Sequence, residues 1–206
     1  MIKPRQNRFI YHFFSFYIQW LIRKNFSCFH FNRVTFDSSK SILLVANHFS
    51  WWDGFFLFYL NQLYFKKKFH VMILEETAKK RKFMKYLGAF SVKKHSKESL
   101  ESLNFAAELL NDPNNLVLIF PQGKICSSHV AEIIFEKGLK QIVKQTKKQF
   151  QFIFSITFVE YFHDKKPSVL SYLTHWKPFQ PLTIHLIQQA FNHYYQQVKT
   201  HHASKQ

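Results

Sequence analysis

The chain has 206 residues, enough for one domain of ordinary size, and its 47% apolar and 20% charged residues exclude a disordered chain. It carries 29 Lys and Arg against 12 Asp and Glu, a formal net charge of +17, so we expect a polyanionic partner such as nucleic acid, an acidic protein or an anionic membrane. Its 26 Phe are typical of a protein that lies where water meets lipid.

Residues 9–22 (FIYHFFSFYIQWLI) predict a helix near the N-terminus. Polar residues recur there at helical spacing and form one narrow stripe, made of Arg8, His12, Ser15, Gln19 and Arg23. We expect residues 1–27 to be an amphipathic segment that contacts a membrane, with burial against the domain core as the alternative. A signal peptide is disfavoured because no small-residue cleavage pattern follows, and a simple spanning helix is not expected because no apolar run reaches about 18 residues.

From residue 28 to residue 206, short apolar stretches alternate with helical patterns. We expect strands at 28–36, 42–46, 70–74, 116–120, 151–159 and 168–173, and helices at 54–64, 78–87, 97–110, 129–145 and 183–199. This alternation predicts a single α/β domain, in which a largely buried mixed sheet is flanked by helices. Cys28 and Cys126 match no zinc or redox pattern, so we expect two reduced thiols and no metal site.

The segment Ala46-Asn47-His48-Phe49-Ser50-Trp51-Trp52-Asp53-Gly54 lies between a predicted buried strand and a predicted helix. Four residues separate His48 from Asp53, so the carboxylate can reach one imidazole nitrogen across a loop that enters a helix. Asp53 would then orient the ring, and the other nitrogen would act as a general base. A helix-capping aspartate beside an incidental histidine gives the same pattern. We interpret Ser50 as a loop or capping residue rather than a nucleophile.

A second block, Phe120-Pro121-Gln122-Gly123-Lys124, follows another predicted buried strand. Together the two blocks resemble the N-H-x4-D and F-P-E-G-[ST] signatures of the glycerolipid acyltransferases, the lysophosphatidic-acid-acyltransferase-like proteins. The stretch 88–94 (GAFSVKK) resembles the family's G-x-[IF]-x-V-[DN]-R block, and Glu75 is similar to the acidic residue that opens it. Residues 152–156 resemble a weak fourth block, so that the resemblance covers about residues 5–200.

The resemblance implies a glycerol-phosphate-acyltransferase-like fold over residues 28–206 and transfer of an acyl group from a thioester to a lipid hydroxyl. The donor would be acyl-coenzyme A or acyl carrier protein, with no further cofactor, metal or covalent enzyme intermediate. His48 would be the general base, oriented by Asp53, and backbone N–H groups near Gly123 would bind the oxyanion. The residues expected to bind substrate are Asn47, Glu75, Gly88, Lys93, Lys94, Phe120, Pro121, Gln122, Gly123 and Lys124.

The chain departs from the family pattern at positions that contribute to acceptor binding. Gln122 replaces the usual Glu, Lys124 stands where Ser or Thr is usual, and Lys93 and Lys94 replace the Asp and Arg of the second block. A lysine offers phosphate a point charge without the bidentate geometry of arginine. The acceptor therefore stays open between a lysophospholipid such as 1-acylglycerol-3-phosphate, an acylated amino acid, a glycolipid and another lipid alcohol.

Residues 66–97 hold eleven Lys and Arg, including Lys97, against Glu75 and Glu76. We expect this run to meet anionic lipid headgroups or an acidic carrier protein beside the active site, with a solvated basic face as the alternative. These features favour a peripheral or monotopic membrane enzyme on the cytoplasmic face. A catalytically inactive accessory protein of the same fold is the first rival hypothesis. A nucleic-acid-binding module is the second, and it is disfavoured because no recognised motif is present.

Overall fold

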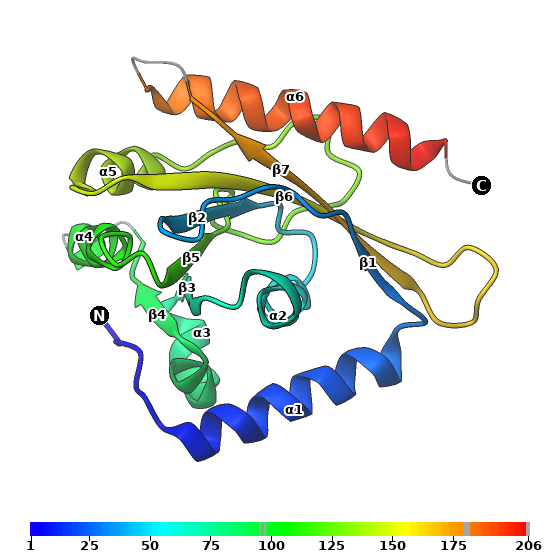
Figure 1. Cartoon of the computed structure of the whole chain (residues 1–206), viewed down its shortest axis with the longest axis horizontal. Coiled ribbons are helices and arrows are strands. Elements are labelled where there is room, and N and C mark those ends of the chain that lie inside the picture. Colours follow the sequence, from blue (N-terminus) through cyan, green and yellow to red (C-terminus); the bar gives the residue numbers. More distant parts are fainter. Residues whose placement is uncertain (95, 97, 179–181, 205–206) are drawn as a thin grey trace.

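The computed structural model describes residues 1–94, 96, 98–178 and 182–204. Within these residues, seven strands form one sheet in the order β1-β7-β6-β2-β5-β3-β4 (Figure 1). The strands are β1 Phe29–Phe31, β2 Ser41–Ala46, β3 Lys68–Leu74, β4 Ala89–Val92, β5 Asn115–Ile119, β6 Phe150–Glu160 and β7 Ser168–Trp176. Neighbouring strands are parallel except β6 and β7, which are antiparallel, so the predicted single α/β domain with a mixed sheet is confirmed.

Helices cover both faces of this sheet. The α-helices are α1 Arg8–Asn25, α2 Asp53–Leu60, α3 Glu75–Lys80, α4 Glu98–Leu109, α5 Gly138–Gln145 and α6 Ile184–Ala203, with a π-helix η1 Asn61–Phe65 and a 3-10 helix η2 Lys82–Leu87. The helices α1, α2 and η2 pack on one face, and α4, α5 and α6 pack on the other (Figure 1).

The central strand β2 is buried along its whole length. Ile42 and Leu44 pack on the side of α1 and α2. Leu43 and Val45 pack on the side of α4, α5 and α6. A strand covered on both faces must be apolar at successive positions, and this explains why the sequence shows a continuous apolar run there rather than an alternation.

Two elements are shorter than the sequence predicts. The strand expected over 28–36 ends at Phe31, because the side-chain amide of Asn32 exchanges hydrogen bonds of 2.9 and 2.6 Å with the backbone of Leu173. The helix expected over 129–145 is wrong for its first half, since α5 begins only at Gly138.

The chain before Gly138 follows α6 instead of coiling into a helix. The N–H groups of Ile133 and Phe135 donate to Asn192 and Gln188 on α6, at 2.8 and 2.9 Å. Both side chains are buried, whereas Ile134 between them is exposed, which is the alternation of an extended chain. Hydrogen bonds to another element therefore override the helical pattern of this segment.

The other expected elements are present, with small differences at their ends. The helix expected over 54–64 divides into α2 and the π-helix η1, and the one expected over 78–87 divides at Arg81 into α3 and η2. The helix expected over 97–110 is α4, and Lys97 lies outside the described residues.

The polar stripe predicted on α1 does not face solvent as a unit. Ser15 is buried, and Gln19 donates a hydrogen bond of 3.1 Å to Gln62 on η1. The large apolar side chains that α1 exposes are Phe9, Phe13, Phe16, Tyr17 and Trp20. None of the helices in the described parts of the chain is long and apolar enough to cross a bilayer.

His70, on β3, makes the stability of the fold depend on pH. Burial, and secondly the charge of Lys68, lower the pKa of His70 from 6.5 to about 4. Between pH 6.5 and about pH 4 the unfolded chain binds more protons than the folded chain. The free energy of unfolding should therefore fall as the pH drops, by up to about 3 kcal/mol. Urea unfolding at several pH values measures this slope. His70→Phe should flatten it, and His163→Phe, on an exposed hairpin, should retain it.

Candidate active site

The His48–Asp53 pair stands where β2 ends and α2 begins. Nδ1 of His48 lies 2.9 Å from Oδ2 of Asp53, as the spacing in the sequence predicts. The same Oδ2 accepts the backbone N–H groups of Phe49 at 2.7 Å and Ser50 at 2.8 Å. Asp53 is only 3% exposed and is the first residue of α2, where backbone N–H groups and the helix dipole favour a negative charge. The carboxylate therefore shapes the loop and orients the imidazole at once.

Ser50 is a loop residue that helps to close the turn before α2, which is one of the two roles, loop or cap, that the sequence suggests. Its Oγ accepts a hydrogen bond from the backbone N–H of Trp52 at 3.2 Å, just before α2 begins. Its carbonyl accepts the N–H of Asp53 at 3.2 Å. These contacts use the side chain and backbone of Ser50 to close the turn that leads into the helix.

The second block forms a tight turn against His48. The N–H of Gly123 donates to the carbonyl of Phe120 at 3.1 Å, and Gly123 has a φ of +62°, which favours glycine. The ring of Phe120 stacks on the imidazole of His48, with centroids 4.2 Å apart and planes inclined by 16°. The aromatic ring thus limits how far the imidazole can rotate.

The backbone of His48 is held on both sides by the same segment. Its N–H donates to Oε1 of Gln122 at 2.6 Å, and its carbonyl accepts the N–H of Cys126 at 2.9 Å. Gln122 is buried and is not among the residues that line the pocket described below. It therefore positions the histidine rather than facing the pocket.

Asn47 joins the loop to the neighbouring strand. Its side-chain amide donates to the carbonyl of Thr157 at 2.9 Å and accepts the N–H of Thr157 at 2.7 Å. Thr157 belongs to β6, next to β2 in the sheet. Asn47 is buried, and both ends of its amide are occupied by this backbone, so it fixes the position from which His48 projects.

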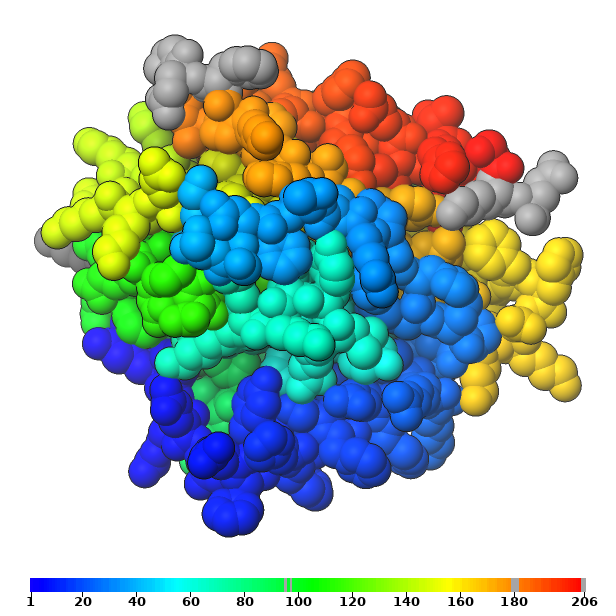
Figure 2. All heavy atoms as spheres, in the orientation of Figure 1, coloured from blue at the N-terminus to red at the C-terminus, as the bar shows by residue number. Residues whose placement is uncertain are grey.

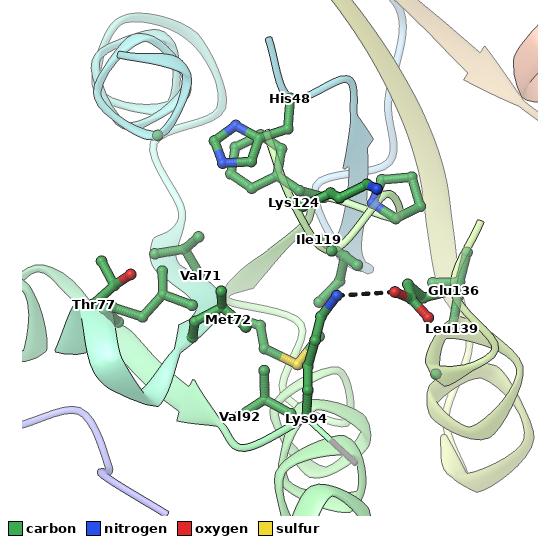
Figure 3. A pocket seen from close by; sticks show the side chains of 18 of the residues that line it. His48, Val71, Met72, Thr77, Val92, Lys94, Ile119, Lys124, Glu136 and Leu139 are labelled. Atoms are coloured by element: carbon green, nitrogen blue, oxygen red, sulfur yellow. Dashed lines mark hydrogen bonds and ion pairs between the residues drawn. The ribbon is translucent and has the colours of Figure 1, made fainter. Parts of the chain in front are cut away.

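A cavity of about 1120 Å³ opens beside His48. Figure 3 shows His48 and Lys124 near one another, with apolar side chains from β3, β4 and β5 along the wall. The apolar lining includes Phe55, Phe58, Phe69, Val71, Met72, Leu87, Leu103, Ile119 and Leu139. A cavity whose lining is mainly apolar suits a ligand that has a long hydrocarbon part.

Lys94 and Lys124 bring positive charge into this cavity, as do Arg81 and Lys137, which also line it. Nζ of Lys94 forms an ion pair of 2.9 Å with Oε1 of Glu136, drawn in Figure 3, and Lys124 lies on the turn next to Gly123. A Cβ on residue 123 would lie 2.7 Å from Nζ of Lys94, so the absence of a side chain at Gly123 makes room for this ion pair.

The predicted substrate-binding residues divide into two groups. Lys94, Phe120, Pro121, Gly123 and Lys124 line the cavity together with His48. The remaining ones, Asn47, Glu75, Gly88, Lys93 and Gln122, do not line it.

Three of those remaining residues have contacts of other kinds. Glu75 pairs with Lys79 at 2.5 Å, and the Lys79 ammonium lowers the pKa of this carboxyl. Lys93 lies 3.6 Å from the carboxylate of Glu98. Gly88 has a φ of +92° and ends η2, where a Cβ would come within 1.8 Å of the carbonyl oxygen of Phe69.

The predicted basic run over 66–97 does not form one face beside the site. Lys66, Lys67 and Lys68 lie at the start of β3, whereas the cations of α3 and η2 follow its other end. The 7 residues of this strand separate the two groups by about 20 Å. The second group, Lys79, Lys80, Arg81, Lys82 and Lys85, follows the carboxyl end of β3, and Lys93 and Lys94 follow the end of its parallel neighbour β4. Lys97 lies outside the described residues.

Sequence reasoning missed Glu136 and Thr157. Glu136 reaches Lys94 because its N–H donates to the carbonyl of Pro121 at 2.8 Å, which fixes an extended segment beside the turn. The sequence pattern predicts a helix at this position, and no local signal in the sequence indicates the extended path. Thr157 binds the side chain of Asn47 through its backbone, so the identity of residue 157 gives no signal in the sequence.

The fold and site define an α/β protein with a His–Asp pair and an apolar cavity at the carboxyl ends of parallel strands. The family model described as Acyltransferase matches residues 30–159, and the chain belongs to this family. The chain is also similar to the crystal structure of the 1-acyl-sn-glycerophosphate acyltransferase PlsC from Thermotoga maritima, with a TM-score of 0.56 and 16% identity over 92% of this chain and 77% of that one. This likeness shows a PlsC-like fold. No curated protein sequence matches the chain.

The hydrogen bond from His48 to Gln122 can be tested by substitution. Gln122→Leu removes the acceptor of a part-buried N–H, which should cost about 1–3 kcal/mol of stability and lower kcat by at least about tenfold. Gln122→Glu keeps an oxygen at the same place and should retain most of the activity. The rate of acyl transfer by the parent and the variants gives kcat and KM. A Leu variant with the parent's kcat would show that this contact does not position His48.

Proposed function

We propose that the protein transfers a fatty acyl group from acyl-coenzyme A or acyl carrier protein to a hydroxyl of a lipid acceptor. The observation that carries the proposal is the His48–Asp53 pair at 2.9 Å, held beside a cavity with an apolar wall. Membership of the acyltransferase family supports it. The acceptor we favour is a lysophospholipid such as 1-acylglycerol-3-phosphate, or another lyso-lipid.

The dyad suits attack of a hydroxyl on a thioester. Nδ1 of His48 contacts Asp53, which leaves Nε2 to take the proton of the acceptor hydroxyl as its oxygen attacks the thioester carbonyl. The resulting imidazolium is stabilised by the Asp53 carboxylate. When the tetrahedral intermediate collapses, the proton passes from Nε2 to the leaving thiolate. The products are an ester and a free thiol, and the enzyme returns to its starting state.

The negative oxygen of the intermediate needs hydrogen-bond donors. The amides near Gly123 are the predicted donors, but the N–H of Gly123 itself is used in the turn to Phe120. The adjoining Lys124, which lines the cavity, is the better candidate through its backbone N–H or its ammonium group. Lys124 also supports an acceptor with an anionic headgroup.

Residues 1–27 fit a membrane-contacting segment. Phe9 is 89% and Phe16 72% exposed on α1, and Lys24 lies 4.7 Å from the ring centre of Trp20. Exposed rings and nearby cations together suit the boundary between acyl chains and anionic headgroups. The ring of Phe14 stacks at 4.5 Å on Phe83 of η2, so the cations of η2 lie close to α1. We propose peripheral association with the cytoplasmic face of a membrane.

The rival hypothesis of an inactive accessory protein is less well supported. In a protein without acyltransferase activity, the catalytic histidine could be replaced without effect. Here His48 is present with its partner Asp53, and Gln122 and Cys126 hold its backbone.

Removing the base gives the direct test of acyl transfer. His48→Ala should lower kcat/KM by about 10²–10⁴-fold, because the acceptor hydroxyl then loses its proton acceptor. The assay follows transfer of labelled acyl groups from coenzyme A and carrier-protein thioesters to 1-acylglycerol-3-phosphate. Ser50→Ala serves as the control and should stay within about threefold of the parent, since the backbone N–H to Asp53 remains. Equal rates for His48→Ala and the parent would refute the mechanism.

Membrane contact by α1 is tested by substituting exposed residues of the helix. Deleting residues 1–27 is unsuitable because it would also remove the core residues Ile18, Ile22 and Phe26. Replacing Phe9, Phe13 and Phe16 together by Ser should weaken binding to phosphatidylglycerol vesicles by at least about tenfold. The thermal midpoint should stay near that of the parent because all three side chains are exposed. Unchanged vesicle sedimentation would exclude α1 as the contact.

A further inference from the structure

The hairpin between β6 and β7 presents a second group of exposed rings and cations. Tyr161 is 63% and Phe162 46% exposed, directly after β6 ends. Lys165 and Lys166 follow and are exposed, and they outnumber the single acidic residue of the turn, Asp164. The hairpin projects from the body of the molecule on the right of Figures 1 and 2.

The hairpin is attached to the active-site edge of the sheet. β6 runs parallel to β2, so the residues that follow β6 emerge at the same edge as His48, which follows β2. The base of the hairpin is also bonded to the end of α1. The N–H of Ser27 donates to the carbonyl of Pro167 at 2.9 Å, and the hydroxyls of Ser27 and Ser168 are 2.9 Å apart.

The strands that carry the hairpin hold it firmly. β6 and β7 are paired without a break from Phe152 opposite Trp176 to Glu160 opposite Ser168. Glu160 lies 3.3 Å from the ring of His202 on α6, and that ring stacks on Phe158 at 4.6 Å. The exposed rings therefore lie at the tip of an arm that is fixed to both the sheet and α6.

We propose that this hairpin, residues 161–166, is a second contact with an anionic lipid surface. The proposal rests on the proposed membrane association of α1. Adjacent aromatic rings with lysines a few residues away suit the headgroup boundary, where rings enter the apolar region and ammonium groups meet phosphates. A long helix in contact with a flat surface can still roll about its axis. A second contact that lies off this axis opposes the roll, and the hairpin would then help to set the direction in which the cavity faces the bilayer.

Vesicle sedimentation with paired variants tests the proposal. Tyr161→Ser with Phe162→Ser should weaken binding to phosphatidylcholine vesicles that contain phosphatidylglycerol by about tenfold. Lys165→Gln with Lys166→Gln should weaken it by up to about thirtyfold, and only when phosphatidylglycerol is present. The control is Lys147→Gln with Lys148→Gln, an exposed lysine pair before β6 and so at the opposite edge of the sheet. The control should bind like the parent.

The outcomes separate this proposal from the proposed function. If both hairpin variants bind vesicles like the parent, the second contact is refuted, and acyl transfer by the parent still stands or falls on its own assay. If those variants bind vesicles normally but show a raised KM for acyl carrier protein thioesters alone, the hairpin contacts the carrier protein and the lipid proposal is overturned. If they lose vesicle binding while the parent transfers no acyl group, the lipid contact holds and the proposed activity fails.

Discussion

The site depends on one carboxylate oxygen. Oδ2 of Asp53 accepts hydrogen bonds from His48 Nδ1 and from the backbone of Phe49 and Ser50. Two of these donors belong to the loop and one to the imidazole, so the loop path and the ring orientation are set by the same atom. A charged acceptor suits this role, because hydrogen bonds to an ionised oxygen are about twice as strong as neutral ones. The position of Asp53 at the start of α2 then ties this loop to a helix that is buried against the sheet.

The two signature blocks, about seventy residues apart in the sequence, meet because β2 and β5 are parallel neighbours. Val45 pairs with Ile119 near the ends of these strands, so the segments that follow must lie side by side. Their contact passes mainly through the backbone of His48, which Gln122 and Cys126 hold from two sides. This explains how glutamine can stand where the family has glutamate, since the contact requires an oxygen acceptor and no charge.

The sequence predicts the sheet and the dyad because both are recorded in local patterns. Buried strands are continuous apolar runs, and the His–Asp spacing specifies a contact across one loop. The partner of Lys94 is not recorded in this way. Glu136 reaches it only because the chain before α5 is extended along α6, through hydrogen bonds to Asn192 and Gln188. The sequence also does not show that β3 divides the basic run, because residues close together in the chain can lie at opposite ends of a strand.

The Lys94–Glu136 pair constrains how an anionic headgroup can bind. Lys94 lies against Gly123 and forms its ion pair within the cavity lining. A phosphate that approached Lys94 would meet the carboxylate of Glu136 beside it, and two negative groups at one ammonium repel each other unless one moves away. Lys124 lies on the turn between Gln122 and Cys126, the two residues that hold the backbone of His48. It takes no part in the Lys94–Glu136 pair. A headgroup that binds at Lys124 would leave the Lys94–Glu136 pair intact, and the selectivity for the acceptor would then depend on Lys124, on Arg81 and Lys137, which also line the cavity, and on the width that Gly123 gives to the turn.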